Sequence, residues 1–404
     1  MTESALPRAD ARGGRLVARR ILLDDRHVLD GAEIVWDRHG RIVRLRRCRE
    51  RPADVVVLPG LVDAHCHLQI APLRASSRAF VPWASAVMAA RAVDDPRRER
   101  ERTLAAARDL LADGVTAVGD IDATGRGFDA LAATGLAGRS YRELTGFHLD
   151  AVSARSLVRQ RSNAARGDVH AGLSPHAPYS VSPALFTAAL RTRRHLAIHC
   201  AETAEEQEFL RAGTGPFREL LERLGRLPEG FRPPRVGAVR WLERLGVLGP
   251  RTQLVHCQEL ERGDVARIAR SGASIVVCPG TISWFGRTPP PVPRWLAAGI
   301  PVGLGTDSRA SNREWSMCAE LALAARWWPE LSPGRRLAMA TTHGAAAIGR
   351  QGLARLRRGG RADFVVVRSD GDVGAAMERF VGGASAPLAV VAGGRAVGPR
   401  ALRR

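Results

Sequence analysis

From residue 55 onward, short β-rich runs that end in polar residues alternate with amphipathic stretches. The amphipathic stretches carry apolar residues at three- and four-residue spacing and end near a glycine, which predicts helices. We interpret as strands the runs 55–67, 114–120, 139–146, 169–176, 196–202, 253–257, 274–280 and 301–308. Strands that alternate with helices in this way form parallel sheets. Eight of them over about 300 residues predict an α/β fold, a (β/α)8 barrel of the TIM type.

Both ends of the chain have a different pattern, with short strand-like runs separated by turns. These runs lie in 15–47, 359–370 and 387–398. We expect the two ends to pair into one small β-sandwich beside the barrel. The expected division is therefore 1–54 for the N-terminal part of the sandwich, 55–352 for the barrel and 353–404 for the C-terminal part.

The longest segment that follows a predicted strand runs from Gln69 to about Arg98. Its prolines and aromatic residues suit a lid over an active site, because long loops at the rim of a scaffold often carry function. Trp83 lies in this segment and is a candidate substrate contact.

The formal net charge of +20 would by itself suggest a nucleic-acid partner. All 61 basic residues are arginines, however, and they are spread over predicted loops and helices without a recognisable nucleic-acid motif. We therefore expect a solvated basic surface and no nucleic-acid partner. The absence of lysine also excludes a binuclear centre bridged by a carboxylated lysine.

The first twenty residues contain no apolar segment of the kind found in secretory signals, and no later stretch approaches an uninterrupted membrane span. We expect a cytoplasmic protein without a membrane partner. The six cysteines form no C-x-x-C pair, which argues against a disulfide framework and a thiolate zinc site. Cys66, Cys200 and Cys257 each follow a histidine, and we expect them to pack between strands and helices.

Catalytic groups of βα barrels lie at the C-terminal ends of the strands. The predicted strand ends carry His65 and His67 on the first strand, His176 on the fourth, His199 with Glu202 on the fifth, His256 on the sixth and Asp307 on the eighth. Five of the 11 histidines thus fall at such ends, which random placement would rarely produce.

The imidazoles of His65, His67 and His199 and the carboxylate of Asp307 form a nitrogen and oxygen donor set for one divalent ion. We expect Zn²⁺, with Fe²⁺ as the alternative, and a position left open for water. A bound divalent ion lowers the pKa of such a water toward neutrality. The competing interpretation is a set of separate core histidines, each held by hydrogen bonds.

Glu202 follows His199 by three residues, which places an acid at the rim of the predicted metal site without making it a ligand. Such an acid could protonate a ring nitrogen of a heteroaromatic substrate. The alternative is a carboxylate favoured by the dipole of the helix that follows. His256 could orient or deprotonate the water, and Asp307 could carry a proton to the leaving group. His176 could contact substrate, support the metal site or form a turn.

Together, "LPGLVDAHCHL", "HAPYSVSPALF", "HCAETAEEQEFL", "LVHC", "GTDSRASN" and "RRGGRADFVVV" resemble the amidohydrolase superfamily, in the branch of mononuclear nucleoside and nucleobase deaminases. The resemblance covers nearly the whole chain, including the split β-sandwich. It implies metal ligands at His65, His67, His199 and Asp307, a proton donor to the purine ring at Glu202, a water-activating group at His256 and a substrate-binding position at His176. Many relatives have glutamate at the position of Gln69, so Gln69 could alter a sugar or ring contact, and Glu143 is a further candidate contact.

Within that branch, "HLQ", "HAPYS" and the "GTDSRAS" form look most similar to aminodeoxyfutalosine deaminases of menaquinone biosynthesis, which convert a 6-aminopurine to a 6-oxopurine. The resemblance implies a small-molecule nucleoside as partner, with a homodimer as one expected assembly. The alternatives are an S-adenosylhomocysteine or methylthioadenosine deaminase, and a hydrolase of triazines or cyclic amides on the same metal site. A basic binding protein without catalysis would have no reason to retain the full donor set.

Overall fold

Eight parallel strands form the central sheet of the computed structural model, which describes residues 8–10, 13–73, 77–161 and 165–397. The sheet is ordered as in the chain, from β6 to β13. Its strands are β6 (Leu61–Cys66), β7 (Val115–Asp122), β8 (Ala137–Leu144), β9 (Val169–Pro175), β10 (Leu196–Cys200), β11 (Thr252–His256), β12 (Ser274–Val277) and β13 (Val302–Leu304). Cys66 pairs with Asp307 beyond β13, so the first and last strands meet and the expected (β/α)8 barrel is confirmed.

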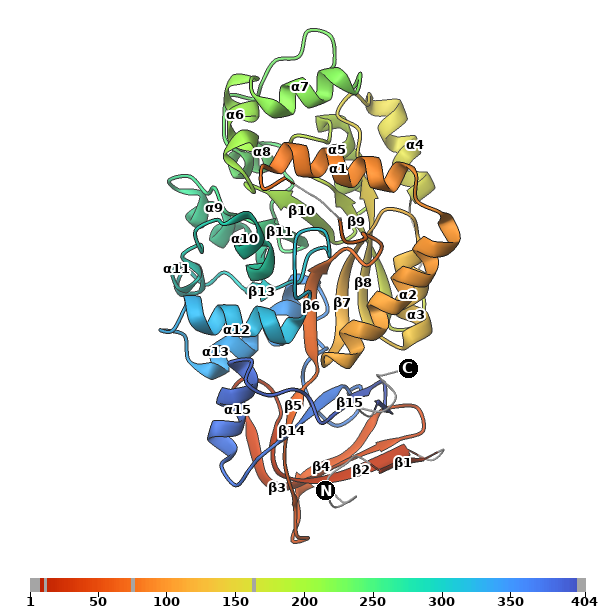
Figure 1. Ribbon diagram of the computed structural model, residues 1–404, viewed down its shortest axis with the longest axis vertical. Helices are drawn as coiled ribbons and strands as arrows, with labels where there is room; N and C mark the ends of the chain where they lie inside the picture. Colours follow the sequence, from red (N-terminus) through yellow and green to blue (C-terminus); the bar gives the residue numbers. More distant parts are fainter. Residues whose placement is uncertain (1–7, 11–12, 74–76, 162–164, 398–404) are drawn as a thin grey trace.

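Helices surround the barrel (Figure 1). In the described part of the chain they are α1 (Phe80–Ala92), α2 (Pro96–Ala112), α3 (Arg126–Thr134), α4 (Ala151–Arg161), α5 (Pro183–Arg191), α6 (Ala204–Ala212), α7 (Pro216–Arg223), α8 (Ala238–Arg244), α9 (Asp264–Ser271), α10 (Pro279–Phe285), α11 (Val292–Ala297), α12 (Met317–Trp327), α13 (Pro333–Met339), α14 (Thr342–Ala347) and α15 (Val373–Val381).

Local sequence signals explain where several of these helices begin. The Asp95 side chain accepts hydrogen bonds from the first-turn N–H groups of α2, and Pro96 occupies the first helical position. Ser182 and Pro183 play the same two parts at the start of α5. Such side-chain caps satisfy N–H groups that have no partner within the helix. The connections between strands and helices are available to build a site at the C-terminal ends of the strands.

A second sheet is built from both ends of the chain and lies below the barrel in Figure 1. Its strands are β1 (Arg8–Asp10), β2 (Gly13–Leu22), β3 (Val28–Asp37), β4 (Ile42–Arg47), β5 (Ala53–Pro59), β14 (Phe364–Arg368), β15 (Ala389–Ala392) and β16 (Arg395–Val397). One continuous path joins seven of them, with β14 paired to β5, and β1 pairs with β2 outside this path. The indole N–H of Trp36 on β3 donates to the carbonyl of Gly394 beside β16, so the sheet curls around its own apolar core.

The structure corrects one predicted strand. The run 55–67 is not a single barrel strand, because β5 belongs to the second sheet and only β6 belongs to the barrel. Gly60 lies between them, and a Cβ at this position would fall 2.1 Å from the hydroxyl oxygen of Thr116. The predicted boundary between residues 54 and 55 therefore cuts through β5, and the first barrel strand begins at Leu61.

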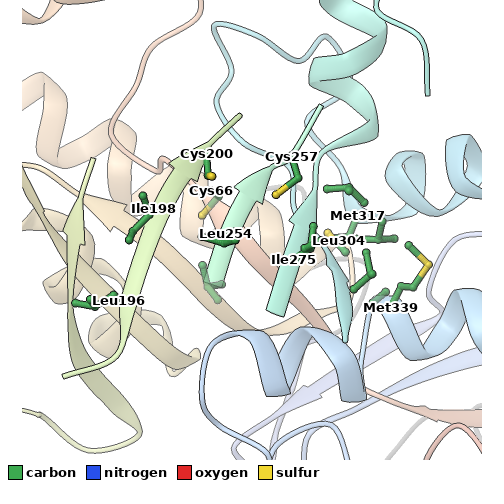
Figure 2. Packing of buried hydrophobic residues seen from close by; sticks show 14 of the residues in the cluster. Cys66, Leu196, Ile198, Cys200, Leu254, Cys257, Ile275, Leu304, Met317 and Met339 are labelled. Atoms are coloured by element: carbon green, nitrogen blue, oxygen red, sulfur yellow. The ribbon is translucent and has the colours of Figure 1, made fainter. Parts of the chain in front are cut away.

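The main core lies between the barrel strands and the helices. Cys66, Cys200 and Cys257 are fully buried in it, as expected, and Figure 2 shows them among side chains such as Ile198 and Leu254. All six cysteines are free thiols. Among the described residues, the structure contains no helix with the length and apolar character that a membrane crossing requires.

Candidate metal centre and active site

Four strand ends bring potential metal donors together at one end of the barrel. The donor atoms of His65, His67 and His199 all lie within 4.8 Å of one another. Those of His65, His256 and Asp307 form a second group that satisfies the same limit. All five side chains are buried, and His65 belongs to both groups. The five residues therefore form one cluster in which His65 is central.

The separations between these donors fit a shared metal ion better than hydrogen bonds. The Nε2 atoms of His65 and His67 lie 3.6 and 3.5 Å from the same Asp307 oxygen, Oδ1. Two ligand atoms that are each ~2.1 Å from a tetrahedral zinc ion lie ~3.4 Å apart. The three atoms are thus spaced as ligands around a common centre.

The polar atoms of the cluster also need a partner. Both ring nitrogens of His65 and Nδ1 of His67 are buried and have no hydrogen-bond partner among the described residues, which is costly unless something else binds them. Nδ1 of His199 lies 2.9 Å from the carbonyl oxygen of His176. Because a carbonyl can only accept, Nδ1 carries the proton and Nε2 of His199 keeps its lone pair for a metal.

The protonation states of the cluster suit a cation. Burial lowers the pKa values of His67 and His256 to about 3, and it holds the pKa of His199 well below the usual range. Burial alone would raise the pKa of Asp307, but its contacts with His65, His256 and His67 outweigh burial and bring this pKa well below the usual value. Neutral imidazoles and an ionised carboxylate are the forms that bind metal. The residues therefore provide a site for one divalent ion, as expected.

Asp307 is held in place from its far side. The hydroxyl groups of Thr281 and Ser311 donate to Oδ2 at 2.8 and 2.9 Å, and the indole N–H of Trp315 donates to the Asp307 backbone carbonyl. These bonds occupy one carboxylate oxygen and leave Oδ1 toward the imidazoles. Outer partners of this kind fix the orientation of metal ligands.

The backbone at the strand ends adopts a conformation that non-glycine residues rarely use. The φ angles are +50° at Ala201, +74° at His256, +53° at Cys257 and +58° at Asp307. Such left-handed residues are uncommon outside glycine and cluster at functional sites. The strand ends are therefore strained where the donors lie.

Gly305 allows the last strand to approach His65, and this contact yields a stability prediction. A Cβ at position 305 would lie 2.6 Å from the His65 carbonyl oxygen and 2.9 Å from the His65 Cβ. We expect Gly305→Ala to lower the free energy of unfolding by about 1–3 kcal/mol and to weaken zinc binding, since β6 and β13 must separate. In the control Gly352→Ala, the new Cβ meets no atom within 4 Å. Urea unfolding and zinc titration measure both effects, and unchanged zinc affinity in Gly305→Ala would contradict the argument.

A single cavity connects the metal cluster with most of the predicted site. The predicted residues that line it are His67, Trp83, Glu143, His176, His199, Glu202, His256 and Asp307. Gln69 is not among the described residues that line this cavity. Its side-chain amide donates to the carbonyl of Ile121, and it lines an adjoining hollow instead. The structure therefore brings together every predicted contact except Gln69.

Glu202 lines the cavity, and only 3% of its surface is exposed. Its Oε1 is 3.7 Å from Nε2 of His256 and 3.6 Å from a guanidinium nitrogen of Arg287. Burial raises the pKa of Glu202 to about 8, although Arg287 opposes this shift. Burial therefore favours the protonated carboxyl group, which can donate a proton.

The start of α6 fixes the position of Glu202. Thr203 caps the helix by accepting the N–H of Glu206, and the Glu206 carboxylate reaches back to accept the N–H of Glu202 at 2.8 Å. This reciprocal arrangement is close to a capping box, and the sequence "TAEE" encodes it. Glu202 itself precedes the helix cap, so it is not one of the first-turn acids of α6.

The apolar roof of the cavity comes partly from the predicted lid segment, which supplies Phe80 and Trp83, and partly from Phe217, which was not predicted. Phe80 on α1 and Phe217 on α7 both line it, with ring centres 6.1 Å apart. Phe217 also stacks on Tyr179, with ring centres 3.9 Å apart. Trp83 is anchored because its indole N–H donates to the carbonyl of Ala310. Aromatic residues in the lid segment were the available signal for α1, but no motif pointed to α7.

Beyond this roof, the adjoining hollow shares several wall residues with the cavity, including Arg91 and Glu143. Arg91 lies 3.5 Å from the Glu143 carboxylate, and the positive charges of His176 and Arg91 outweigh burial and lower the pKa of Glu143. Arg223 and Arg226 also line the hollow. The outer part of the site therefore presents guanidinium groups next to apolar walls.

Known proteins resemble the chain over most of its length. Residues 56–397 match the sequence pattern of the amidohydrolase family. An aminodeoxyfutalosine deaminase of Deinococcus radiodurans is 32% identical over 332 residues, which cover 74% of this chain and 75% of that protein. A 5-methylthioadenosine/S-adenosylhomocysteine deaminase of Nitratidesulfovibrio vulgaris is 29% identical over 336 residues, which cover 78% of this chain and 71% of that protein.

A solved structure shares the fold. A zinc-bound adenosine deaminase of Xanthomonas campestris superposes with a TM-score of 0.76 at 21% identity, and the match covers 95% of this chain and 92% of that protein. The family match spans the barrel strands as well as β14 and β15 of the second sheet. The chain therefore belongs to the amidohydrolase family of hydrolases.

Proposed function

We propose that the protein hydrolytically deaminates a 6-aminopurine nucleoside and that aminodeoxyfutalosine is its substrate. The observation that carries this proposal is the buried Glu202, whose Oε1 lies 3.7 Å from Nε2 of His256 and which shares one cavity with the metal donors. A buried acid at this place can protonate a ring nitrogen, which is what the loss of an exocyclic amino group requires. The activity would place the enzyme in menaquinone biosynthesis.

His65, His67, His199 and Asp307 are the proposed metal ligands. A divalent ion held by these residues supplies Lewis-acid chemistry and lowers the pKa of a bound water toward neutrality. His256 is neutral because burial lowers its pKa to about 3, so its Nε2 can accept a proton from the attacking water. This residue is therefore the proposed water-activating group.

Glu202 donates its proton to the ring nitrogen beside C6 of the purine, which makes C6 more electrophilic. Water adds to C6, the bond from C6 to the amino nitrogen breaks, and ammonia leaves. The ionised Asp307 accepts the proton of the new hydroxyl group on C6 and passes it to the departing nitrogen, so that a C6 carbonyl forms as the C–N bond breaks. The proton that His256 accepted from water then returns to Glu202. His176 and Trp83 line the cavity and are the proposed contacts of the nucleoside, with Glu143 near its sugar.

The outer part of the site supports the finer choice of substrate. Phe80, Phe217 and Leu220 form an apolar wall, and Arg91 and Arg226 border it. A nucleoside whose sugar carries an aryl group that ends in a carboxylate would bury the ring on this wall and place its charge beside the arginines. Aminodeoxyfutalosine has this chemistry.

The second candidate is deamination of S-adenosylhomocysteine or methylthioadenosine, which the Nitratidesulfovibrio relative favours. Ammonia release by the zinc-loaded protein separates the two, with aminodeoxyfutalosine, S-adenosylhomocysteine, methylthioadenosine, adenosine, guanine and a chlorotriazine as substrates. We expect the highest kcat/KM for aminodeoxyfutalosine. A higher kcat/KM for another adenine nucleoside would make that nucleoside the proposed substrate. Absence of ammonia release from every purine would overturn the proposal.

The pKa of Glu202 predicts the pH dependence. Because the protonated carboxyl is the active form and its pKa is raised to about 8, kcat/KM should fall as pH rises through that value. The expected slope is about tenfold per pH unit at higher pH, as for a single essential acid. A pH profile between 6 and 10 at constant ionic strength measures it. Constant kcat/KM up to pH 10 would rule out Glu202 as the essential acid.

A further inference from the structure

We propose that Arg287 is a positioning residue that holds the Glu202 carboxyl group at the cavity and ties it to α1. Glu202 would then be placed correctly only while α1 packs over the site. The inference rests on the proposed function, because it assumes that Glu202 donates the proton. Its basis is the set of contacts that the Arg287 side chain makes on two sides.

On one side, a guanidinium nitrogen of Arg287 lies 3.6 Å from Oε1 of Glu202. The Arg287 side chain is 18% exposed and the Glu202 side chain 4%, so the contact is largely shielded from water. Arg287 is not among the described residues that line the cavity. It therefore touches the acid rather than the substrate.

On the other side, the guanidinium lies over two aromatic rings. Its carbon is 4.5 Å from the ring centre of Phe285 on α10 and 5.5 Å from that of Phe80 on α1. Phe285 belongs to the same segment as Arg287, whereas Phe80 belongs to the helix that roofs the cavity. Guanidinium groups stack on aromatic faces in this way, and a lysine ammonium lacks the planar shape to replace them fully.

The backbone around Arg287 fixes where its side chain starts. Gly286 adopts a left-handed conformation at the end of α10, with φ of +65°, and the N–H of Arg287 donates to the carbonyl of Ile282. Three prolines follow at 289–291, and the buried Trp328 donates its indole N–H to the carbonyl of Pro290. A rigid segment thus presents Arg287 to both Glu202 and Phe80.

The test measures kcat and KM of zinc-loaded wild type, Arg287→Met and Arg287→Lys with the best purine nucleoside. We expect Arg287→Met to lower kcat by about 10- to 100-fold, which is part of what general-acid catalysis contributes, while KM changes little. Arg287→Lys should recover part of kcat, since it restores a positive charge beside Glu202. Coformycin, which resembles the tetrahedral state, should lose affinity for Arg287→Met in parallel with kcat.

A double-mutant cycle tests the link to α1. Arg287→Met should lower kcat by a smaller factor in a Phe80→Leu background than in the wild type, because the two side chains act together. Phe217→Leu is the matched control, because the Phe217 ring lies near Phe80 while the Arg287 guanidinium lies over the Phe80 ring. We expect the factors by which Phe217→Leu and Arg287→Met lower kcat to multiply in the double variant. Arg294→Met removes an exposed arginine of α11 and should leave kcat and KM unchanged.

The outcomes are distinguishable. A raised KM with unchanged kcat in Arg287→Met would overturn the inference, because Arg287 would then bind substrate. If the factors by which Phe80→Leu and Arg287→Met lower kcat simply multiplied, Arg287 would not connect Glu202 to α1. A wild-type protein that deaminates no purine would instead overturn the proposed function, and the inference with it. Zinc content and thermal unfolding of each variant exclude loss of the fold as the cause.

Discussion

Glu202→Gln should bind zinc as the wild type does and lose about 10²- to 10⁴-fold in kcat, the range that a general acid contributes. The glutamine side chain has nearly the same volume and keeps the backbone N–H that Glu206 accepts. It cannot donate an acidic proton to the ring. Because Glu202 is a proposed proton donor and not a ligand, the metal content should not change. Single-turnover kinetics and zinc analysis of the purified variant measure both quantities.

Glu205→Gln is the matched control for this variant. Glu205 lies in the first turn of α6, where a carboxylate interacts favourably with the helix dipole. Its loss should cost about 0.3–1 kcal/mol of stability at most and leave kcat unchanged. If Glu202→Gln behaved like Glu205→Gln, the carboxyl of Glu202 would be a structural group at the helix start. An unchanged kcat in Glu202→Gln would therefore contradict the proposed mechanism.

The metal donors could be found from the sequence because one rule places them. Parallel barrel strands end on one face, so residues far apart in the chain, such as His65, His199 and Asp307, had to meet there once the strands were identified. The barrel and the pairing of both chain ends followed from local patterns in the same way. These features depend on periodicity and turn residues, which a single sequence displays directly.

The features that were missed depend on contacts that leave no local pattern. Val55 to Val62 is apolar on both sides of Gly60, so periodicity could not show that one strand ends in the second sheet and another begins in the barrel. Gln69 lies two residues after His67, yet its side-chain amide donates to the carbonyl of Ile121, and Gln69 lines the adjoining hollow and not the cavity. Arg287 reaches Glu202 from a different connection, and its sequence context resembles that of many surface arginines in this basic chain.

Replacing the central ligand should have the largest effect of all. In His65→Ala, we expect zinc content to fall well below one ion per chain and deamination to become undetectable, since His65 belongs to both donor groups. Zinc that binds only the folded state stabilises it, by about 4 kcal/mol at a thousand times the dissociation constant. Added zinc should therefore raise the unfolding temperature of the wild type but not of His65→Ala. Without zinc, the variant should lose less stability than a usual core truncation, because both nitrogens of His65 are buried without a partner in the described part of the chain.

His195→Ala provides the matched control for the zinc response. His195 is also a buried barrel histidine, but it precedes β10 at the opposite end of the strand and its Nδ1 lies 3.1 Å from the Tyr141 hydroxyl. This variant should lose stability and still respond to zinc. Chelation should abolish the activity of the wild type and zinc should restore it. If zinc stabilised His65→Ala as much as the wild type, the ion would bind elsewhere, and the donor set at the strand ends would be a cluster of core histidines after all.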